Sequence, residues 1–397
     1  MNGPSDLRKD LNLLHVFTLA SGAMIGSGLF ILPGLAHKMA GPGVIWSYIL
    51  AGLLATTGAL SMAELATAMP RAGSDYFFIM RGFGAGAGSI AGMLSWFSLS
   101  LKSAFAIVGM ATFLSLIVNL TGLASGVVLT VFFVLLNIFG VREAARFQAF
   151  VVITLFSLLI LYVVVGLPRT SAELLIPFAP YGTTRIFSTA GFVFISYGGL
   201  IKVASVAEEV RDPGRVLPRG LALAIIAVTI LYALVVLVTS GVVASSELDG
   251  SLTPISDGGR IIMGEFGFVM MSVAAILAFV STANAGIMAS SRYLLALSRD
   301  KLLPQPLGRI NRRFQTPQVA IAVTGGLILL SLFLELKILV EAASCVLILT
   351  YMLSCLAVIV LRESGLHNYR PAFKSPFYPW LLIAGVGGLG YVLFELG

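Results

Sequence analysis

Residues 21–30 read Ser-Gly-Ala-Met-Ile-Gly-Ser-Gly-Leu-Phe and lie in the middle of the first long apolar segment, 13–36. Three glycines and two serines fall within eight residues, and each glycine disfavours helix by about 0.8–1.0 kcal/mol relative to alanine. Interrupted backbone inside a membrane is tolerated only where protein buries it or a polar cavity solvates it. The stretch therefore predicts a broken helix beside a mid-membrane cavity, and such a cavity predicts a ligand.

A similar interruption is expected at residues 196–199, Ser-Tyr-Gly-Gly, in the sixth apolar segment. We call residues 22–28 the first break and residues 196–199 the second break. Two broken helices, one in each half of a membrane chain, are the best sequence indication of the binding site of a secondary transporter.

The composition is that of an integral membrane protein. Of the 397 residues, 58% are hydrophobic and only 11% are charged, with a mean hydropathy of +0.99, whereas a soluble domain carries about 25% charged residues. The net charge of +7 invites a nucleic-acid partner, but an excess of Lys and Arg in cytoplasmic loops explains it equally well. We therefore expect the lipid bilayer, and no nucleic acid, as a partner.

The cysteines and histidines give no sign of a metal site. Cys345 and Cys355 fall within one apolar segment without metal-ligand spacing and are expected to be reduced packing residues. The three histidines are scattered along the chain. No metal and no cofactor are predicted, apart from Na⁺ as a possible coupling ion.

Eleven segments are long and apolar enough to span a membrane, which takes about 20 apolar residues. They cover 13–36, 44–68, 86–118, 125–140, 147–167, 186–207, 220–244, 266–297, 317–334, 338–361 and 376–396. With the N-terminus in the cytoplasm, 18 Lys and Arg residues fall on the inside and 5 on the outside. This asymmetry predicts a multi-pass protein of the cell membrane with a cytoplasmic N-terminus.

The number of spans predicts an inverted repeat. If residues 1–168 hold spans one to five and residues 169–363 hold spans six to ten, the second unit starts on the opposite side of the membrane. The expected fold is therefore an all-α integral membrane, five-plus-five inverted-repeat bundle with discontinuous first and sixth helices. Residues 364–397 form the eleventh span outside the repeat. The sequence carries no signal for oligomeric state.

Ordered motifs occur along nearly the whole chain, at residues 22–30, 63–65 with 70–76, 136–143 with 145–148, 207–213 with 217–219, and 281–282 with 290–292, 298–300 and 303–304. Together they resemble the amino acid–polyamine–organocation (APC) superfamily. The resemblance implies the leucine-transporter fold and the import or exchange of amino acids or related amines. Most members have twelve spans, one more than the number counted here.

A zwitterionic substrate at the first break would find donors for its carboxylate in the backbone of Gly26, Ser27 and Gly28, where the outer half of the helix starts. The alternative is a small-residue packing face between helices. The resemblance implies Phe194 as an aromatic gate, and ordinary packing is the competing interpretation. The predicted substrate-binding residues are Ala23, Met24, Ile25, Gly26, Ser27, Gly28, Phe194, Ser196, Tyr197 and Gly198.

The ammonium of the same substrate needs acceptors. Backbone carbonyls freed at Ala23, Met24, Phe194 and Tyr197 are the candidates, and the resemblance implies the same positions. No acidic side chain lies in either break. Because a second buried cation needs a carboxylate partner, this argues against a polyamine or dicationic substrate and favours neutral or weakly cationic amino acids.

The resemblance also implies a site for a coupling cation. Five oxygens around a hard ion suit Na⁺, although Ser and Thr also bond back to their own helix. The residues implied are Gly22, Ile25, Ala278, Ser281 and Thr282. Proton-coupled relatives often carry a lysine in the fifth span instead, and the aligned residue here is Leu155.

Lys102 falls midway along the third span. A lysine near the bilayer centre costs about 2.5–3.5 kcal/mol on insertion scales, so such a residue is a functional hypothesis by default. We expect Lys102 to accept a proton or to stand in for the coupling cation. The competing interpretation is a structural lysine that bonds carbonyls of the broken helices.

Charged residues near the cytoplasmic end of the sixth span are expected to form an inner gate. Lys202, Glu208 and Glu209 are the candidates, paired with arginines, and surface ion pairs are the alternative. The arginines considered are Arg71, Arg142 and Arg292, and Glu64 is a further candidate for the same network.

Taken together, the sequence predicts secondary active transport of amino acids across the cytoplasmic membrane by alternating access, coupled to H⁺ or Na⁺ or run as exchange. The alternatives are transport of another small amine or organic cation, or an ion channel on the same fold. No catalytic residues are expected, since no His/Asp/Glu cluster, phosphate loop or Ser-His arrangement occurs among the spans.

Overall fold

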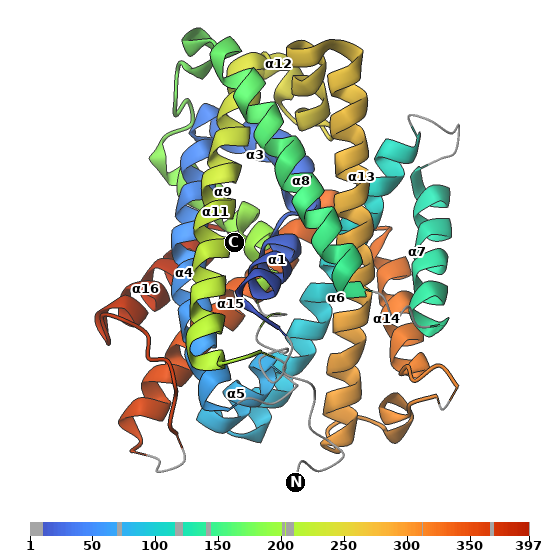
Figure 1. Cartoon of the computed structure of the whole chain (residues 1–397), viewed down its shortest axis with the longest axis vertical. Helices are drawn as coiled ribbons and strands as arrows, with labels where there is room; N and C mark the ends of the chain where they lie inside the picture. Colours follow the sequence, from blue (N-terminus) through green and yellow to red (C-terminus); the bar gives the residue numbers. More distant parts are fainter. Residues whose placement is uncertain are drawn as a thin grey trace.

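The computed structural model describes residues 11–69, 74–115, 122–139, 144–200, 203, 210–311, 313–365 and 369–396. Within these ranges the chain is helical, and its one β-type contact is an isolated parallel bridge between Leu11 and Val210 (Figure 1). The helices of the first half are α1 Leu13–Met24, α2 Ser27–Phe30, α3 Leu32–Ala40, α4 Val44–Ala68, α5 Ser74–Phe83, α6 Ala85–Ser115, α7 Gly122–Phe139 and α8 Ala144–Gly166.

The second half continues with α9 Thr183–Val193, η4 Phe194–Tyr197, α11 Pro213–Val242, α12 Ser245–Leu248, α13 Pro254–Arg299, α14 Gln318–Ser331, α15 Leu336–Glu363 and α16 Trp380–Leu396. Short 3₁₀ turns lie between several of these helices. Each of the eleven predicted spans overlaps a helix, and α4 has the predicted bounds, 44–68.

Seven helical stretches of the described chain are long and apolar enough to cross a membrane: Leu32–Ala68, Ala85–Ser115, Gly122–Phe139, Ala149–Arg169, Pro213–Val242, Pro254–Arg299 and Leu336–Glu363. Leu13–Met24, Gln318–Ser331 and Trp380–Leu396 are apolar but shorter. The prediction of an all-helical membrane protein is confirmed at this level, while the five-plus-five repeat stays a prediction.

Helix α13 begins earlier than the apolar signal indicates. It covers 46 residues, and Gly264 interrupts it with φ +68° and ψ −158°, a region that glycine reaches without a Cβ penalty. The residues before Gly264 form a short helix that packs back on the main part, where the backbones of Gly259 and Gly267 approach closely. The predicted span 266–297 therefore corresponds to the part of α13 that follows the kink.

The broken helix α1–α2–α3 lies inside the bundle. Helix α1 packs against α8 and α11, α2 packs against α13 and α6, and α3 packs against α9. Figure 1 shows α1 near the middle of the molecule, with α7 and α14 on one side and α16 on the other. Large apolar side chains such as Phe132, Phe150 and Ile226 remain exposed on outer helices, as expected of a surface that faces lipid.

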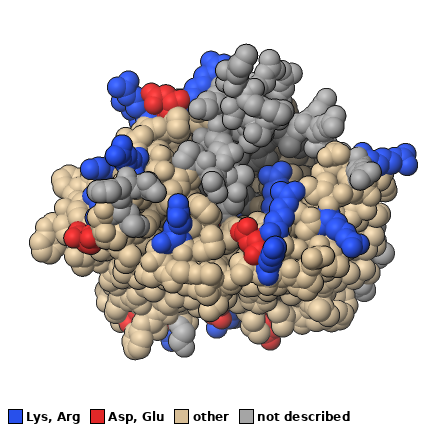
Figure 2. Space-filling model, turned by 90° about the horizontal axis from the view of Figure 1, so that it is seen from below, with Lys and Arg blue, Asp and Glu red and all other residues tan. Residues whose placement is uncertain are grey.

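Basic residues gather on the lower face of the molecule. Figure 2 shows this face with more Lys and Arg than Asp and Glu around its rim. The short helix α5 lies at the same end (Figure 1).

Candidate functional site

The first span is interrupted where the glycine-serine cluster predicts. Helix α1 ends at Met24, Ile25 has extended backbone (φ −70°, ψ 94°), and Gly26 is not helical (φ −151°, ψ −147°). Helix α2 then starts at Ser27. The break leaves backbone groups near Ala23–Gly26 free for partners other than the helix itself.

The sixth span is interrupted as well. Helix α9 ends at Val193, and Phe194–Tyr197 continue as a single 3₁₀ turn, η4. The N–H of Gly198 then donates to the carbonyl of Ile195 at 3.1 Å. The second break therefore begins two residues earlier than predicted, at Phe194.

The two breaks contact each other directly. A Cβ at Gly199 would overlap the backbone of Ala23, and a Cβ at Gly28 would overlap Ser196. On the other side, a Cβ at Gly26 would overlap the hydroxyl of Thr282 on α13. Glycine is therefore required at these three positions, because the backbones of the two breaks and helix α13 meet there.

Buried tyrosines satisfy several carbonyls that the breaks release. Tyr232 donates to the carbonyl of Met24 at 2.7 Å, and Tyr351 donates to that of Tyr197 at 3.0 Å. Tyr48 donates to the carbonyl of Gly28 at 3.1 Å and accepts, through its own carbonyl, from the Tyr197 hydroxyl at 2.9 Å. All four tyrosines are buried.

Of this tyrosine cluster (Tyr48, Tyr197, Tyr232 and Tyr351), sequence reasoning identified only Tyr197. A signal was present, because a tyrosine hydroxyl inside an apolar span needs a hydrogen-bond partner. Ser344 of α15 was missed too; it accepts from the N–H of Ile195 at 3.1 Å and donates to the carbonyl of Phe192 at 3.0 Å.

Lys102 of α6 joins the two breaks. Its ammonium donates to the carbonyl of Ile195 at 3.1 Å and to that of Ala23 at 3.4 Å, and only 5% of the residue is exposed. These contacts match the competing interpretation, in which Lys102 is a structural lysine that bonds carbonyls of the broken helices. They also bring a cationic group to the carbonyls where a substrate ammonium or a coupling ion was expected.

The residues predicted to hold a cation lie on α13 beside the first break. Ala278, Ser281 and Thr282 are buried or nearly so, and the Thr282 hydroxyl faces Gly26. The hydroxyls of Ser21 and Ser27 are buried without a hydrogen-bond partner among the described residues. Gly22 and Ile25 are buried at the same place. The break therefore has polar groups available for a ligand.

Other predicted residues have simple surroundings. Phe194 packs edge-on against Tyr351, with ring centroids 5.5 Å apart. Leu155, which stands where proton-coupled relatives carry lysine, lies in the apolar core and is 1% exposed. Cys345 and Cys355 are free cysteines, as expected.

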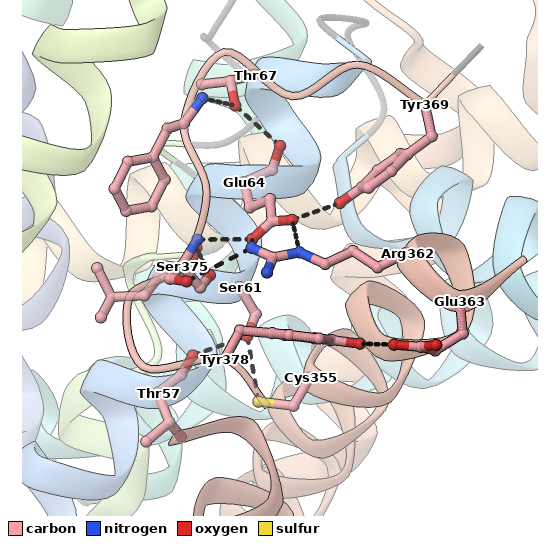
Figure 3. A network of polar contacts seen from close by, with 12 residues as sticks. Thr57, Ser61, Glu64, Thr67, Cys355, Arg362, Glu363, Tyr369, Ser375 and Tyr378 are labelled. Atoms are coloured by element: carbon pink, nitrogen blue, oxygen red, sulfur yellow. Dashed lines mark hydrogen bonds and ion pairs between the residues drawn. The ribbon is translucent and has the colours of Figure 1, made fainter. Parts of the chain in front are cut away.

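The predicted gate residues Lys202, Glu208 and Glu209 lie outside the described residues, as do Arg71 and Arg142. Glu64, the further candidate for the same network, lies in α4. Its partner is Arg362 of α15, whose guanidinium donates to both carboxylate oxygens at 2.7 and 2.6 Å (Figure 3). The two residues are 298 positions apart, so sequence spacing could not pair them.

The Glu64 network ties α4 and α15 to the segment before α16 (Figure 3). Glu64 is completely buried and also accepts from the Tyr369 hydroxyl at 2.9 Å and from the N–H of Ser375 at 2.7 Å. Burial, and then the adjacent carboxylate, raise the pKa of Tyr369, so this hydroxyl stays a donor. Nearby, Tyr378 donates to Glu363 at 2.6 Å.

A small cavity of about 10 Å³ adjoins the second break, with room for about one water molecule. Of the predicted site residues, Gly198 and Lys102 line it. The full lining is Ser95, Ser98, Leu99, Lys102, Ile195, Gly198, Tyr293, Leu347 and Thr350.

An acidic residue lies behind the wall of this cavity. Asp75 of α5 is buried and accepts from the hydroxyls of Ser95, at 2.5 Å, and Tyr293. Sequence reasoning did not single out Asp75, although it is the one acidic residue between the second and third predicted spans. The cavity thus has Lys102 on its wall and a hydrogen-bonded carboxylate behind it.

The sequence of this chain is similar to those of known proteins. The sequence matches the family described as "Amino acid permease" over residues 11–396. The chain belongs to this family. The resemblance to the APC superfamily is therefore confirmed, and the family consists of transporters, not enzymes.

Curated relatives cover most of the chain. It is 28% identical to the branched-chain amino acid permease BcaP of Bacillus subtilis (strain 168), over 95% of this chain and 86% of the relative. It is also 28% identical to the methylthioribose transporter of the same organism, over 98% and 89%. A third relative, the vacuolar cationic amino acid transporter 4 of Arabidopsis thaliana, is 28% identical over 91% of this chain and 64% of its own length. These names span neutral, cationic and sugar-derived molecules.

Proposed function

We propose that this permease carries small amino acids across the cell membrane by alternating access, with the substrate held at the two breaks. The observation that carries the proposal is the contact between two interrupted helices, Ala23 against Gly199 and Gly28 against Ser196, deep in the bundle. A neutral amino acid such as the branched-chain class named for BcaP is the first candidate.

In this proposal the substrate carboxylate approaches the backbone of Gly26, Ser27 and Gly28. The hydroxyl of Ser27, which is buried without a hydrogen-bond partner in the part of the chain that the structure describes, supports a polar ligand there. Phe194 closes over the substrate. The tight packing of Gly28 on Ser196 means that the substrate enters only when the two breaks separate, which is the motion that alternating access requires.

Two routes to ion coupling follow from the same residues. One is a cation held by Gly22, Ile25, Ala278, Ser281 and Thr282. The other replaces that cation by the ammonium of Lys102, and it is supported by the donation of Lys102 to a carbonyl from each break. Exchange without net ion movement is the third mode, and ion-gradient experiments separate the three.

The proposal also includes the orientation of the chain in the membrane and its inverted repeat. By the positive-inside rule we assign the basic rim of the lower face (Figure 2) to the cytoplasmic side, and we propose that the N-terminus lies on that side. We propose two inverted units, 1–168 and 169–363, followed by the span in 364–397. Lys202, Glu208 and Glu209 form the inner gate.

Uptake by the purified protein in proteoliposomes tests the proposal. Labelled leucine, alanine, serine and lysine are offered under imposed Na⁺ or H⁺ gradients, and again with vesicles preloaded with the unlabelled amino acid. We expect saturable uptake of at least one neutral amino acid and transient counterflow. Uptake without saturation or counterflow indicates a channel and contradicts the proposal.

The methylthioribose relative provides a second candidate substrate class. If the protein takes up labelled methylthioribose and none of the amino acids, methylthioribose replaces the amino acid as the proposed substrate. A thermal-shift screen of the same compounds gives an independent check, because a ligand at 100 times its Kd stabilises the protein by about 2.7 kcal/mol.

A further inference from the structure

An open, largely apolar groove lies between α7 and α14, two helices that Figure 1 shows at one side of the molecule. Its lining residues are Ile138, Gln318, Val319, Ala322 and Val323. Val319 and Val323 are 42% and 43% exposed, and residues four apart on a helix lie on one face. In a chain that spans a membrane this apolar face meets hydrocarbon, and a lipid acyl chain is the ligand that matches it.

The chain just before α14 is bonded to both walls of the groove. The side-chain amide of Asn311 donates to the side-chain oxygen of Gln318 at 3.0 Å, and its oxygen accepts from the N–H of Arg313 at 2.8 Å. The hydroxyl of Thr316 donates to the carbonyl of Ile138 at 2.7 Å. Gln318 belongs to α14 and Ile138 to α7. We call Asn311, Arg313 and Thr316 the polar end of the groove.

The polar end of the groove carries an exposed guanidinium, that of Arg313. Its central carbon lies 5.3 Å from the ring centroid of Phe314, within the range of a cation–π attraction. The Phe314 ring in turn packs edge-on against Phe139 of α7, with centroids 5.3 Å apart. The aromatic pair therefore keeps the charge of Arg313 beside the groove.

The stretch from the end of α13 to the start of α14 is basic. Residues 299–316 contain five Lys or Arg residues and one acidic residue, Asp300, whose carboxylate accepts from the Tyr76 hydroxyl. Neither Arg309 nor Arg313 forms an ion pair with a carboxylate in the part of the chain that the structure describes. Since the apolar helix α14 begins shortly after Arg313, these arginines lie at the depth of lipid head groups.

We propose that the groove between α7 and α14 binds one anionic phospholipid, with an acyl chain along Val319 and Val323 and the phosphate bonded to the guanidinium of Arg313. A guanidinium offers two parallel N–H donors that match the oxygens of a phosphate. Basic sites between transmembrane helices favour anionic head groups for this reason. The site is separate from the two breaks, and the inference holds whichever molecule the permease carries.

A second copy of the chain fits this groove less well than a lipid does. Two copies in one membrane have the same orientation, so a symmetric pair formed at the groove would place the polar ends of both grooves side by side. The arginines of the two copies would then repel each other. A lipid phosphate has the opposite charge, and its acyl chain matches the apolar wall.

Native mass spectrometry of the 397-residue chain in detergent micelles tests the site with two probes that share the same acyl chains. Dioleoylphosphatidylglycerol is anionic, and dioleoylphosphatidylcholine is zwitterionic. For the wild type, we expect one phosphatidylglycerol to bind about fivefold more tightly than phosphatidylcholine, or more tightly still. This is the ratio that one basic residue near the membrane surface gives.

Two substitutions separate the head group from the acyl chain. Arg313→Gln should weaken phosphatidylglycerol binding about fivefold and leave phosphatidylcholine binding unchanged. Val323→Trp fills the groove and should weaken both lipids alike. The matched controls lie on α11: Arg215→Gln, at a side chain that is 77% exposed, and Ile226→Trp, at a residue that is 56% exposed. Both controls should bind the two lipids as the wild type does.

The outcomes decide between the possible occupants of the groove. If the wild type binds the two lipids equally, or if Arg313→Gln keeps the wild-type preference, the inference is wrong. A dimer that Val323→Trp dissociates and that retains no phosphatidylglycerol assigns the groove to a second copy, which also overturns it. If Val323→Trp does not fold, Arg313→Gln decides alone, because Arg313 is exposed. None of these results bears on the uptake experiment, so the proposed function stands or falls separately.

Discussion

Two buried polar regions of this membrane protein differ in how completely their groups are bonded. In the Glu64 network, the two carboxylate oxygens accept from the Arg362 guanidinium twice, from Tyr369 and from the N–H of Ser375, which fills the roughly four lone-pair positions of a carboxylate. At the first break, the hydroxyls of Ser21 and Ser27 are buried without a partner among the described residues.

The difference distinguishes a structural connection from a binding site. A fully bonded buried network has no capacity left for a ligand, and removing one member leaves the others unpaired. Spare hydroxyls beside interrupted backbone cost stability and persist where a ligand uses them. Four substitutions should therefore affect the two regions in different ways.

Removal of the buried carboxylate should have the largest effect. Glu64→Ala leaves the Arg362 guanidinium, which is 15% exposed, without its counter-charge. We expect a loss of about 3–5 kcal/mol of unfolding free energy, measured by denaturing-detergent titration of the purified protein. Glu363→Ala, which removes an exposed carboxylate next to Arg362, should cost less than about 1 kcal/mol. Equal effects of the two substitutions would show that the network is not the structural connection described here.

Filling the contact between the two breaks with a methyl group should have the second-largest effect. Gly199→Ala inserts a Cβ against the backbone of Ala23, which has no side-chain rotation to relieve the overlap. We expect about 1–3 kcal/mol of destabilisation and loss of uptake. Gly326→Ala, where a Cβ meets nothing within 4 Å, should be neutral or stabilise by about 0.4–1 kcal/mol. Wild-type uptake by Gly199→Ala would contradict the close contact of the two broken helices.

Loss of one tyrosine hydroxyl is a smaller change. Tyr232→Phe removes the donor to the carbonyl of Met24 at 2.7 Å and should cost about 1–3 kcal/mol, because a buried carbonyl is left without a partner. The matched control is Tyr181→Phe, at a residue that is 56% exposed, and its thermal stability should stay within about 0.5 kcal/mol of wild type. If both variants melt like wild type, another group must satisfy Met24.

The smallest change in stability is expected at the first break itself. Ser27→Ala removes a hydroxyl for which the described residues provide no partner, so the protein should be as stable as wild type or slightly more so, while the KM for the transported amino acid rises. Ser375→Ala removes a donor to the carbonyl of Leu60 at 3.2 Å and should cost about 0.5–1.5 kcal/mol without altering KM. If Ser375→Ala instead raised KM at wild-type stability, and Ser27→Ala lowered stability at an unchanged KM, the Glu64 network and the first break would have been assigned the wrong roles.

The sequence predicted the elements whose signal is local. The glycine-serine cluster at residues 21–28 sits inside an apolar span, and only an interruption reconciles these two properties. The bounds of α4 follow from a continuous apolar run, 44–68, between polar residues. Lys102 was identified because a lysine at membrane depth is rare enough to need an explanation.

The partners of these residues could not be predicted, because they are distant in sequence. Arg362 reaches Glu64 across 298 positions and Tyr232 reaches Met24 across 208. Asp75 stands in a short segment without apolar periodicity, so nothing in the sequence shows that it is buried. The kink at Gly264 was missed since a single glycine in a polar stretch normally indicates a loop.

If the substrate binds at the two breaks, it should protect a cysteine placed beside them from labelling. Ser98 lines the cavity, and Ser98→Cys in a background without Cys345 and Cys355 gives a single thiol to label with a small methanethiosulfonate reagent. We expect the transported amino acid to slow labelling, with half-protection at its KM for uptake. A labelling rate that saturating substrate leaves unchanged, in a variant that still transports, would contradict binding at the broken helices.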